Sequence, residues 1–154
     1  PSVARRVSSA AYRPMVTGDA IRDYSIWRES PAFFPYNREH ALKPLSDFPD
    51  AIAFIWPFRT ELGNRATFSR QTYFTEGRPW YEWHQLPKDE HAHDWQISFA
   101  EIATHNHFVL DTQGRVFKQT APVIKFPASS TSQVFFNMLA LLNSSTTCFW
   151  LKQV

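Results

Sequence analysis

The chain closes with the stretch QVFFNMLALLNSSTTCFWLKQV, residues 133–154. The apolar run up to Leu142 predicts a helix, and the hydroxyl-rich residues 129–132 before it offer N-cap side chains. A break is expected at Asn143-Ser144-Ser145, followed by a second apolar helix that reaches Val154 without a cap signal. Because the sequence stops inside an apolar helix, we expect a domain that is truncated at its C-terminal helix and cut from a larger protein.

Upstream of this stretch the sequence predicts strands. Residues 96–103 alternate polar and apolar side chains over most of their length, which is typical of a half-buried strand. His107–Leu110 and Arg115–Lys118 predict a hairpin joined through the Gly-containing turn Asp111–Gly114. Residues 122–126 predict one more short strand.

A second group of elements is predicted before residue 85. Residues 66–84 are rich in Thr, Phe, Tyr and Trp, which is the composition of strands. A helix is expected from about Asp50 to Asn64, where Pro57 should kink it or mark a new start. No strand-helix-strand rhythm and no internal repeat is visible, so the expected fold class is α+β, with a mixed or antiparallel sheet and flanking helices.

The N-terminal part divides into an arm and the start of the folded domain. Residues 1–14 show no clear period and are expected to be an arm or linker. The domain is expected to cover residues 15–154, starting with a Gly18-Asp19 turn that enters a short element. Prolines break residues 31–57 into short pieces, and within them Phe33–Tyr36 is expected to be extended and to pack in the core.

Composition restricts the class of protein. A chain of 154 residues with 44% hydrophobic and 16% aromatic residues can build a core, which excludes a disordered segment. The single Cys148 cannot form an internal disulfide, and the sequence has neither a signal peptide nor an apolar run near eighteen residues. We therefore expect a soluble, cytoplasmic protein without a membrane partner.

Charge is informative only in its distribution, because the formal net charge is +2. Arginines between residues 59 and 78 are opposed only by Glu61 and Glu76, and no carboxylate follows Asp111. Local cationic excess suits phosphate contacts, although a solvated surface produces the same pattern. The cations concerned are Arg59, Arg65, Arg70, Arg78, Arg115, Lys118, Lys125 and Lys152.

Residues 76–85 form the densest polar-aromatic stretch, EGRPWYEWHQ. Its residue types suit nucleic-acid recognition, because arginine can bond guanine, glutamine can bond adenine, and aromatic rings can stack. The alternative is that Trp80, Tyr81 and Trp83 are packing residues while Arg78 and His84 are exposed.

Enzymatic signals are weak. His105-Asn106-His107 spells a nuclease motif whose real ligands are spread over a longer segment. The pairs His91/His93 and His105/His107 would each share a face of a strand, with Asp94 or Asp111 as further metal ligands, but structural or surface histidines are favoured. Phe33-Phe34-Pro35-Tyr36 lacks the Asn of an amino-methyltransferase motif, no glycine-rich cofactor loop occurs, and Cys148 has no nucleophile context.

Four long motifs and an opening turn nevertheless carry a family resemblance that spans about residues 15–154. The tail also resembles the close of the TaqI-like specificity domain, and residues 16–24 resemble its Gly-Asp-x-Ile-Arg opening. The motifs are GRPWYEWHQLP (77–87), ATHNHFVLD (103–111), VFKQTAPVIK (116–125) and LLNSSTTCFWLKQV (141–154). Together they resemble the downstream region of the PglX-type adenine-specific DNA methyltransferases of BREX phage-defence systems.

The resemblance implies a target-recognition-domain-like fold and a role in choosing the DNA sequence. The parent enzyme would transfer a methyl group from S-adenosylmethionine to a flipped adenine. This segment would be catalytically silent alone and hold no cofactor or metal. Its partners would be double-stranded DNA, the catalytic domain of the parent chain and other defence-system proteins.

The expected DNA contacts are of two kinds. Phosphate or base contacts are assigned to Arg59, Arg65, Arg70, Arg78, Lys118 and Lys125, and weaker base-edge contacts to His84, Gln85 and Asn106. Two other functions stay open. The first is a structural or protein-docking module of the same defence system, and the second is a small histidine-metal hydrolase.

Overall fold

A computed structural model describes residues 11–37, 39–86 and 92–153 of the chain. The chain forms two compact units, one from Pro1–Tyr12 with Phe33–Glu90 and one from Arg13–Ala32 with His91–Val154. We call the described part of the first the helical unit and that of the second the sheet unit. Helices and strands are intermixed in chain order, which confirms the α+β class.

The sheet unit is built on an antiparallel sheet of order β6-β5-β8. Its strands are β5 (Ala92–Phe99), β6 (Phe108–Asp111) and β8 (Val123–Pro127). Ile97 on the central strand lies opposite Leu110 and Ile124, is fully buried, and contributes about 1.5–3 kcal/mol by burial. The expected strands at 96–103 and 122–126 are thus confirmed, the first beginning and ending earlier than expected.

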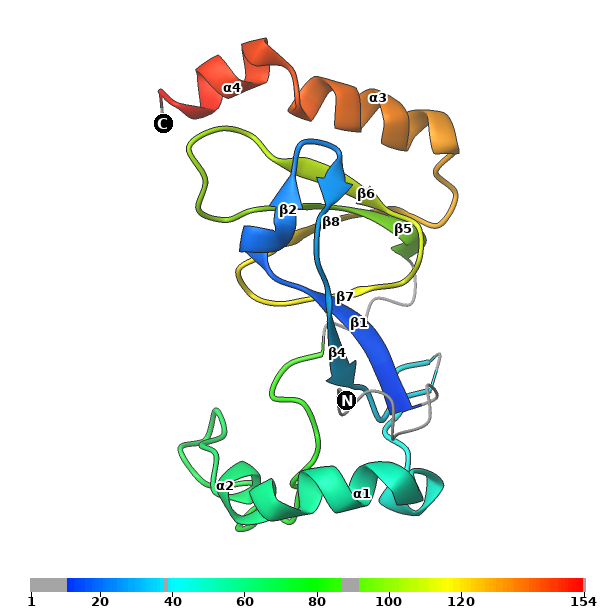
Figure 1. Cartoon of the computed structure of the whole chain (residues 1–154), viewed down its shortest axis with the longest axis vertical. Helices are drawn as coiled ribbons and strands as arrows, with labels where there is room; N and C mark the ends of the chain where they lie inside the picture. The colour runs from blue at the N-terminus through cyan, green and yellow to red at the C-terminus, as the bar shows by residue number, and fades with distance from the viewer. Residues whose placement is uncertain (1–10, 38, 87–91, 154) are drawn as a thin grey trace. The chain divides into compact units, whose positions relative to one another are not determined.

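Helix α3 lies against one side of this sheet, and α4 follows it (Figure 1). Helix α3 (Ser132–Leu142) begins after the N-cap Thr131, and α4 (Ser145–Leu151) follows the break at Asn143-Ser144. Phe135 of α3 is fully buried and packs in one cluster with Ile97 and Phe108. Its ring contacts Trp95 and Phe126. The predicted helix, break and second helix are confirmed, but α4 ends at Leu151 with Lys152 as C-cap, and Val154 lies outside the described residues.

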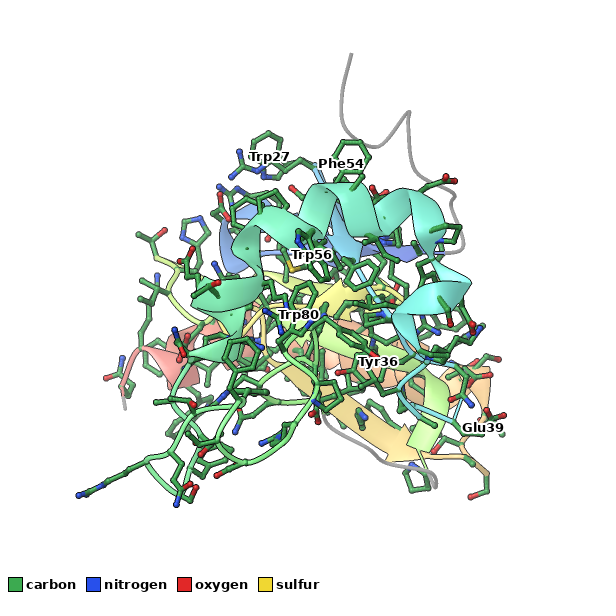
Figure 2. All side chains as sticks on the ribbon, turned by 90° about the horizontal axis from the view of Figure 1, so that it is seen from below. Trp27, Tyr36, Glu39, Phe54, Trp56 and Trp80 are labelled. Atoms are coloured by element: carbon green, nitrogen blue, oxygen red, sulfur yellow. The ribbon has the colours of Figure 1, made fainter. Side chains whose placement is uncertain are left out.

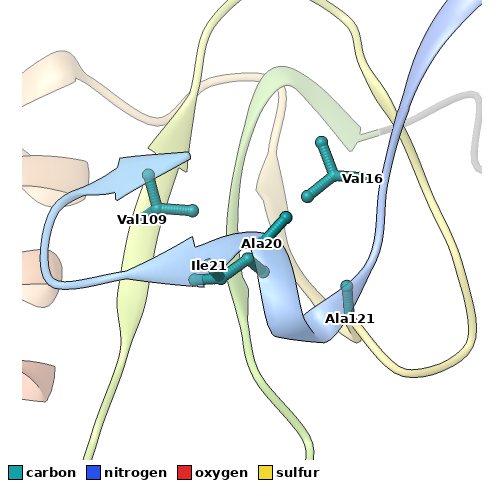
Figure 3. Close-up of a cluster of buried hydrophobic side chains, with 5 residues drawn as sticks. All are labelled: Val16, Ala20, Ile21, Val109 and Ala121. Atoms are coloured by element: carbon teal, nitrogen blue, oxygen red, sulfur yellow. The ribbon is translucent and has the colours of Figure 1, made fainter. Parts of the chain in front are cut away.

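A second core of the sheet unit lies where the chain's early residues meet β6 (Figure 3). The helical turn Gly18–Ala20 leads into the hairpin of β2 (Ile21–Arg22) and β3 (Ser25–Ile26). A Cβ on Gly18 would lie 2.1 Å from the carbonyl oxygen of Thr120, so only glycine allows this approach. The buried side chains are Val16, Ala20, Ile21, Val109 and Ala121.

Strand β1 (Tyr12–Val16) begins inside the segment that we expected to be an arm. It lies between β4 (Ser30–Phe33) and β7 (Val116–Phe117) and pairs in parallel with β7, Met15 opposite Val116. Residues 1–10 of the expected arm lie outside the described part of the chain.

The helical unit contains α1 (Pro49–Ile55), a 3-10 turn over Trp56–Phe58, and α2 (Arg59–Gly63), preceded by a 3-10 turn over Leu45–Asp47. The break at Pro57 confirms the predicted interruption, because proline cannot supply the amide donor of a continuous helix. Ala51 of α1 packs with Ala11 and Phe48, with Phe33 and Phe54 around them. Phe34, Pro35 and Tyr36 are buried, which confirms the expected core role of that segment.

The prediction of strands over residues 66–84 is wrong. The described residues of this segment form turns, with a single bridge between Ala66 and Thr72. Thr72 and Thr75 bond each other's backbone and side chains, which offers the backbone an alternative to a sheet ladder. Arg70 and Gly77 have φ values of 62° and 68°, a turn conformation that strands do not contain.

The predicted hairpin at residues 107–118 is also wrong, although both of its strands exist. Strand β6 pairs with β5, and β7 pairs with β1. The buried Asp111 carboxylate accepts the backbone N–H groups of Gln113 and Arg115, and Gly114 has a φ of 68°. This side-chain-capped turn replaces the interstrand bonds that a tight hairpin would have formed.

Within the described ranges no single helix is long and apolar enough to cross a membrane. Helices α3 and α4 pass the length and composition test only as a pair, and that pair is bent by 61°.

Candidate nucleic-acid interface

Tyr73 is the centre of the helical unit's arginine-rich region. Its side chain is fully buried, and the guanidinium carbons of Arg65 and Arg78 lie 4.4 and 4.5 Å from its ring centroid. Its hydroxyl is 3.3 Å from Nδ1 of His84. Cations over a desolvated aromatic ring contribute stability, so Tyr73 fixes two of the predicted arginines.

Arg65 holds the turn segment to the end of α2. Its Nε donates to the carbonyl oxygen of Leu62 at 2.8 Å, and its Nη2 donates to those of Trp80 and Glu82 at 3.1 and 2.7 Å. These donors are used by the fold. Arg65 therefore enters the proposed interface as a residue that positions the segment 80–82.

Arg78 is paired with acidic side chains. It donates two hydrogen bonds to Glu82, at 3.2 and 2.9 Å, and lies 3.9 Å from Glu76. The hydrogen bond with Glu82 raises the pKa of Arg78 above its ordinary value. The side chain is 32% exposed, so part of it still faces solvent.

Glu76 organises the turns that present Arg70. Its Oε1 accepts hydrogen bonds from Ser69 and, at 2.6 Å, from Thr67. These bonds, with Ser69 first, lower the pKa of Glu76 below its ordinary value. Arg70 lies in the turn that they close, exposed to solvent and donating its backbone N–H to Thr67.

Arg59 lies beside two aromatic rings at the start of α2. Its guanidinium carbon is 5.4 Å from the Trp56 ring centroid and 5.0 Å from that of Phe74. Trp56 also meets the buried Trp80 edge to face at 6.1 Å (Figure 2). The ring of Phe74 lies directly against Gly63, where any Cβ would clash with it.

The exposed members of this region are aromatic or cationic. Trp56, Phe58 and Phe68 are 55%, 55% and 73% exposed. Among the described residues, neither Arg59 nor Arg70 forms an ion pair with a carboxylate. We call the following residues the arginine–aromatic set: Trp56, Phe58, Arg59, Phe68, Arg70 and Phe74.

An open cleft of about 580 Å³ lies beside two of the three predicted base-edge residues. Its lining includes His84 and Gln85, which are exposed, together with Arg78 and Trp83. Trp83 is held rigidly, because its backbone N–H donates to the Tyr36 hydroxyl at 2.7 Å and its indole N–H to the Phe33 carbonyl at 2.9 Å. Burial raises the pKa of Tyr36 above its ordinary value, so it stays a neutral part of this wall.

Three predicted contacts belong to the sheet unit. Lys118 is exposed directly after β7, and Lys125 is half-buried in β8 opposite Gln96. Asn106 donates to the carbonyl oxygen of Leu142 at 2.6 Å, which commits its amide to holding the α3–α4 break. The structure therefore distributes the predicted residues over both units, with Arg59, Arg65, Arg70, Arg78, His84 and Gln85 in the helical unit.

The histidines that we considered as metal ligands have other surroundings. The rings of His105 and His107 are tilted against each other with centroids 5.1 Å apart, and Nδ1 of His107 is 2.7 Å from a carboxylate oxygen of Asp23. Across residues 11–37, 39–86 and 92–153 no three His, Cys, Asp or Glu side chains gather as a metal site. His91 lies outside the described residues, as does the side chain of His93.

Sequence reasoning did not single out Tyr73, Trp56 and Phe68, which lie among the arginines of the candidate interface. The signal that could have found them is the placement of aromatic residues between the arginines of the sequence. We interpreted those aromatic residues as strand composition instead. Arg115, which the sequence placed among the basic residues, bonds Glu29 and Asp111 at 2.7 and 3.0 Å, and this pairing was not predicted. Burial lowers the pKa of Arg115, but the bonds to Glu29 and Asp111 outweigh this and leave it raised.

No family model matches the chain. Over its whole length, however, the chain is similar to a protein of Streptomyces coelicolor (strain ATCC BAA-471 / A3(2) / M145) named "Adenine-specific methyltransferase PglX", with 51% identity over 156 aligned residues. The chain spans 13% of the length of that relative.

Proposed function

Because this chain is homologous along its whole length to a segment of an adenine-specific methyltransferase of the PglX type, we propose that it is the DNA target-recognition part of such an enzyme. The parent protein would methylate adenine in DNA with S-adenosylmethionine, in a phage-defence system of the BREX type. The segment contributes binding and no chemistry of its own. The catalytic domain of the parent chain would be its covalent partner.

The observation that carries this proposal is the arginine–aromatic set. Arg59 and Arg70 are exposed and not committed to carboxylates among the described residues, whereas Arg65 and Arg78 support the segments around them. Uncommitted guanidiniums bind phosphate well, and exposed rings such as Trp56 and Phe74, which lie beside Arg59, can stack on bases or pack on sugars. The set thus combines both kinds of contact that a DNA-binding surface needs.

Each residue's exposure and hydrogen bonds support the role that we propose for it. Arg59, Arg70, Lys118 and Lys125 are assigned to phosphates, and His84, Gln85 and the exposed part of Arg78 to base edges. Arg65 and Asn106 position the neighbouring backbone, because their donors are used by carbonyl oxygens of the fold. Base-edge readout by the cleft residues would supply the sequence choice.

The proposal is tested by the binding of the full chain to a fluorescein-labelled, mixed-sequence duplex at low salt. The double substitution Arg59→Gln and Arg70→Gln should weaken binding and reduce the salt slope by about one for each arginine that no longer neutralises a phosphate. The matched control is Arg28→Gln, an exposed arginine of the sheet unit that pairs with Asp19. Equal affinity of the double variant and the control would overturn the assignment.

A second candidate function is protein docking within the same defence system. It is favoured by exposed apolar side chains on α3 and α4, of which Phe136, Leu141 and Trp150 are 50%, 58% and 64% exposed. A docking module would bind duplex DNA weakly and with little dependence on salt, so the same titration separates the two functions.

A further inference from the structure

A second cleft lies wholly within the sheet unit. Its volume is about 510 Å³, and it is lined by the β2–β3 turn, the loop that precedes β6, the α3–α4 break and part of α4. We call it the α4 cleft. The lining side chains that matter here are Asp23, Tyr24, His105, Phe149 and Lys152.

Hydrogen bonds hold the walls of the α4 cleft to the end of β6. The side chain of Asn143 accepts the backbone N–H of Phe108 at 3.0 Å and donates to the Phe108 carbonyl at 2.9 Å. The backbone N–H of Tyr24 donates to that same carbonyl at 3.2 Å. The β2–β3 turn and the α3–α4 break are therefore fixed against one residue, and the cleft between them is preorganised.

Two aromatic side chains from different walls remain exposed at this cleft. Tyr24 is 57% exposed and Phe149 is 60% exposed. Tyr24 has a φ of 59°, a conformation that bulky residues rarely adopt. The turn thus holds Tyr24 in a strained conformation although its ring does not fill the core. Such a ring is available to stack on a planar ligand.

The polar groups at the cleft complement a nucleotide. Lys152 supplies an ammonium group for a phosphate, and His105 adds a further donor or acceptor. The Asp23 carboxylate is oriented by His107 at 2.7 Å, yet its side chain is 65% exposed. A carboxylate in this position can accept a hydrogen bond from an exocyclic amine of a base.

We propose that the α4 cleft binds one unpaired nucleotide, with its base against Tyr24 and Phe149 and its phosphate at Lys152. The Asp23 carboxylate favours bases that carry an exocyclic amine over thymine. The inference rests on the proposed function only for the source of this nucleotide, which would be a base displaced from duplex DNA. The chemistry of the cleft itself is the same for a free nucleotide.

The first experiment titrates the full chain with adenosine 5′-monophosphate and monitors binding by two-dimensional amide NMR. Shifts should gather at Asp23, Tyr24, Phe149 and Lys152, and Phe149→Ala should raise Kd about tenfold because the base can no longer stack on that ring. The matched control is Phe136→Ala, which removes a phenylalanine of α3 that is 50% exposed and should leave Kd unchanged. Thymidine 5′-monophosphate should bind more weakly, and ribose 5-phosphate weaker still.

Shifts scattered over the surface, or equally weakened binding in Phe149→Ala and Phe136→Ala, would overturn the assignment of the cleft. Equal binding of ribose 5-phosphate would show a phosphate site only and would contradict the role of the two rings.

The second experiment compares a duplex that contains one unpaired adenine with the fully paired duplex. If the chain binds the duplex with the unpaired adenine more tightly, and Phe149→Ala removes this preference, then DNA is the source of the bound nucleotide. If adenosine 5′-monophosphate binds at the cleft but neither duplex binds, the cleft assignment stands and the DNA-recognition proposal fails. If both duplexes bind equally and the mononucleotide does not bind, the DNA-recognition proposal stands and the cleft assignment fails.

Discussion

Asp111 illustrates how one buried side chain directs the chain at a turn. It is fully buried, and its carboxylate accepts two backbone N–H groups and the Arg115 guanidinium, with Gln96 a further donor at 3.3 Å. A buried charge is tolerated only when it is paired and hydrogen-bonded in this way. The same bonds turn the chain away from the hairpin that the sequence pattern favoured.

The Asp111→Ala substitution should destabilise the sheet unit by about 3–5 kcal/mol, because it leaves the half-buried Arg115 and two backbone donors without this acceptor. The measurement is chemical denaturation of the variant beside Asp94→Ala, which removes an exposed carboxylate from β5. If the two variants unfolded at the same denaturant concentration, Asp111 would not organise the turn.

A pH dependence follows from Glu76, whose pKa is lowered by its bonds with Ser69 and Thr67. A carboxyl with a depressed folded-state pKa adds stability above its ordinary pKa and loses it as the pH falls through the folded-state value. Glu76→Gln should therefore lower the melting temperature at neutral pH, and this difference should shrink as the pH falls below the ordinary glutamate range. Thermal denaturation across pH measures both, and a pH-independent difference would contradict the role assigned to the ionised carboxylate.

At the scale of elements, the α3–α4 break connects two helices to the sheet. Asn143 ends α3 and bonds both backbone groups of Phe108, while Ser144 caps α4 by accepting the N–H of Thr147 at 3.2 Å. This short break therefore fixes the end of α3 to the start of β6 and sets where α4 begins.

Asn143→Ala should cost about 1–3 kcal/mol, because the backbone N–H and carbonyl of Phe108 lose their side-chain partner. Asn137→Ala is the control, since Asn137 is an exposed residue of α3 whose side chain accepts a bond from Gln133. Hydrogen exchange at Phe108 should accelerate only in the first variant, and equal exchange in both would contradict the proposed link.

Elements were predictable where a local pattern and the final packing agree. The apolar period of α3, the break at Asn143 and the interruption at Pro57 depend on neighbours in sequence and were predicted correctly. Strand partners were not predictable, because the parallel pairing of β1 with β7 joins residues that are far apart in the chain. The segment 66–84 misled the prediction because its threonines and aromatic residues serve turns and arginine contacts around Tyr73.

The sequence named the residues of the candidate interface by type, and only the fold shows which of their donors are already used. Arginines at 59 and 70 remain exposed, as a phosphate-binding role requires. Arg65 and Asn106 could not be separated from them by sequence, since only the folded chain shows that carbonyl oxygens use their donors. A local excess of cations therefore indicates the region for candidate phosphate contacts. The hydrogen bonds of the folded chain then indicate which residues in it have free donors.

At the scale of the whole molecule, binding to DNA would draw on local charge, because the formal net charge of +2 is small. The proposed phosphate contacts occur in both units, Arg59 and Arg70 in one, Lys118 and Lys125 in the other. Each contact made to duplex DNA releases counterions, so the number of contacts used is readable from the salt dependence of the affinity.

The most direct measurement is the affinity of the full chain for a mixed-sequence duplex over a range of salt concentrations. Four phosphate contacts predict a plot of log affinity against log salt with a slope of about −3 to −4, and contacts from one unit alone predict about −2. A slope near zero, or no detectable binding at the lowest salt, would contradict the proposal that this chain recognises DNA.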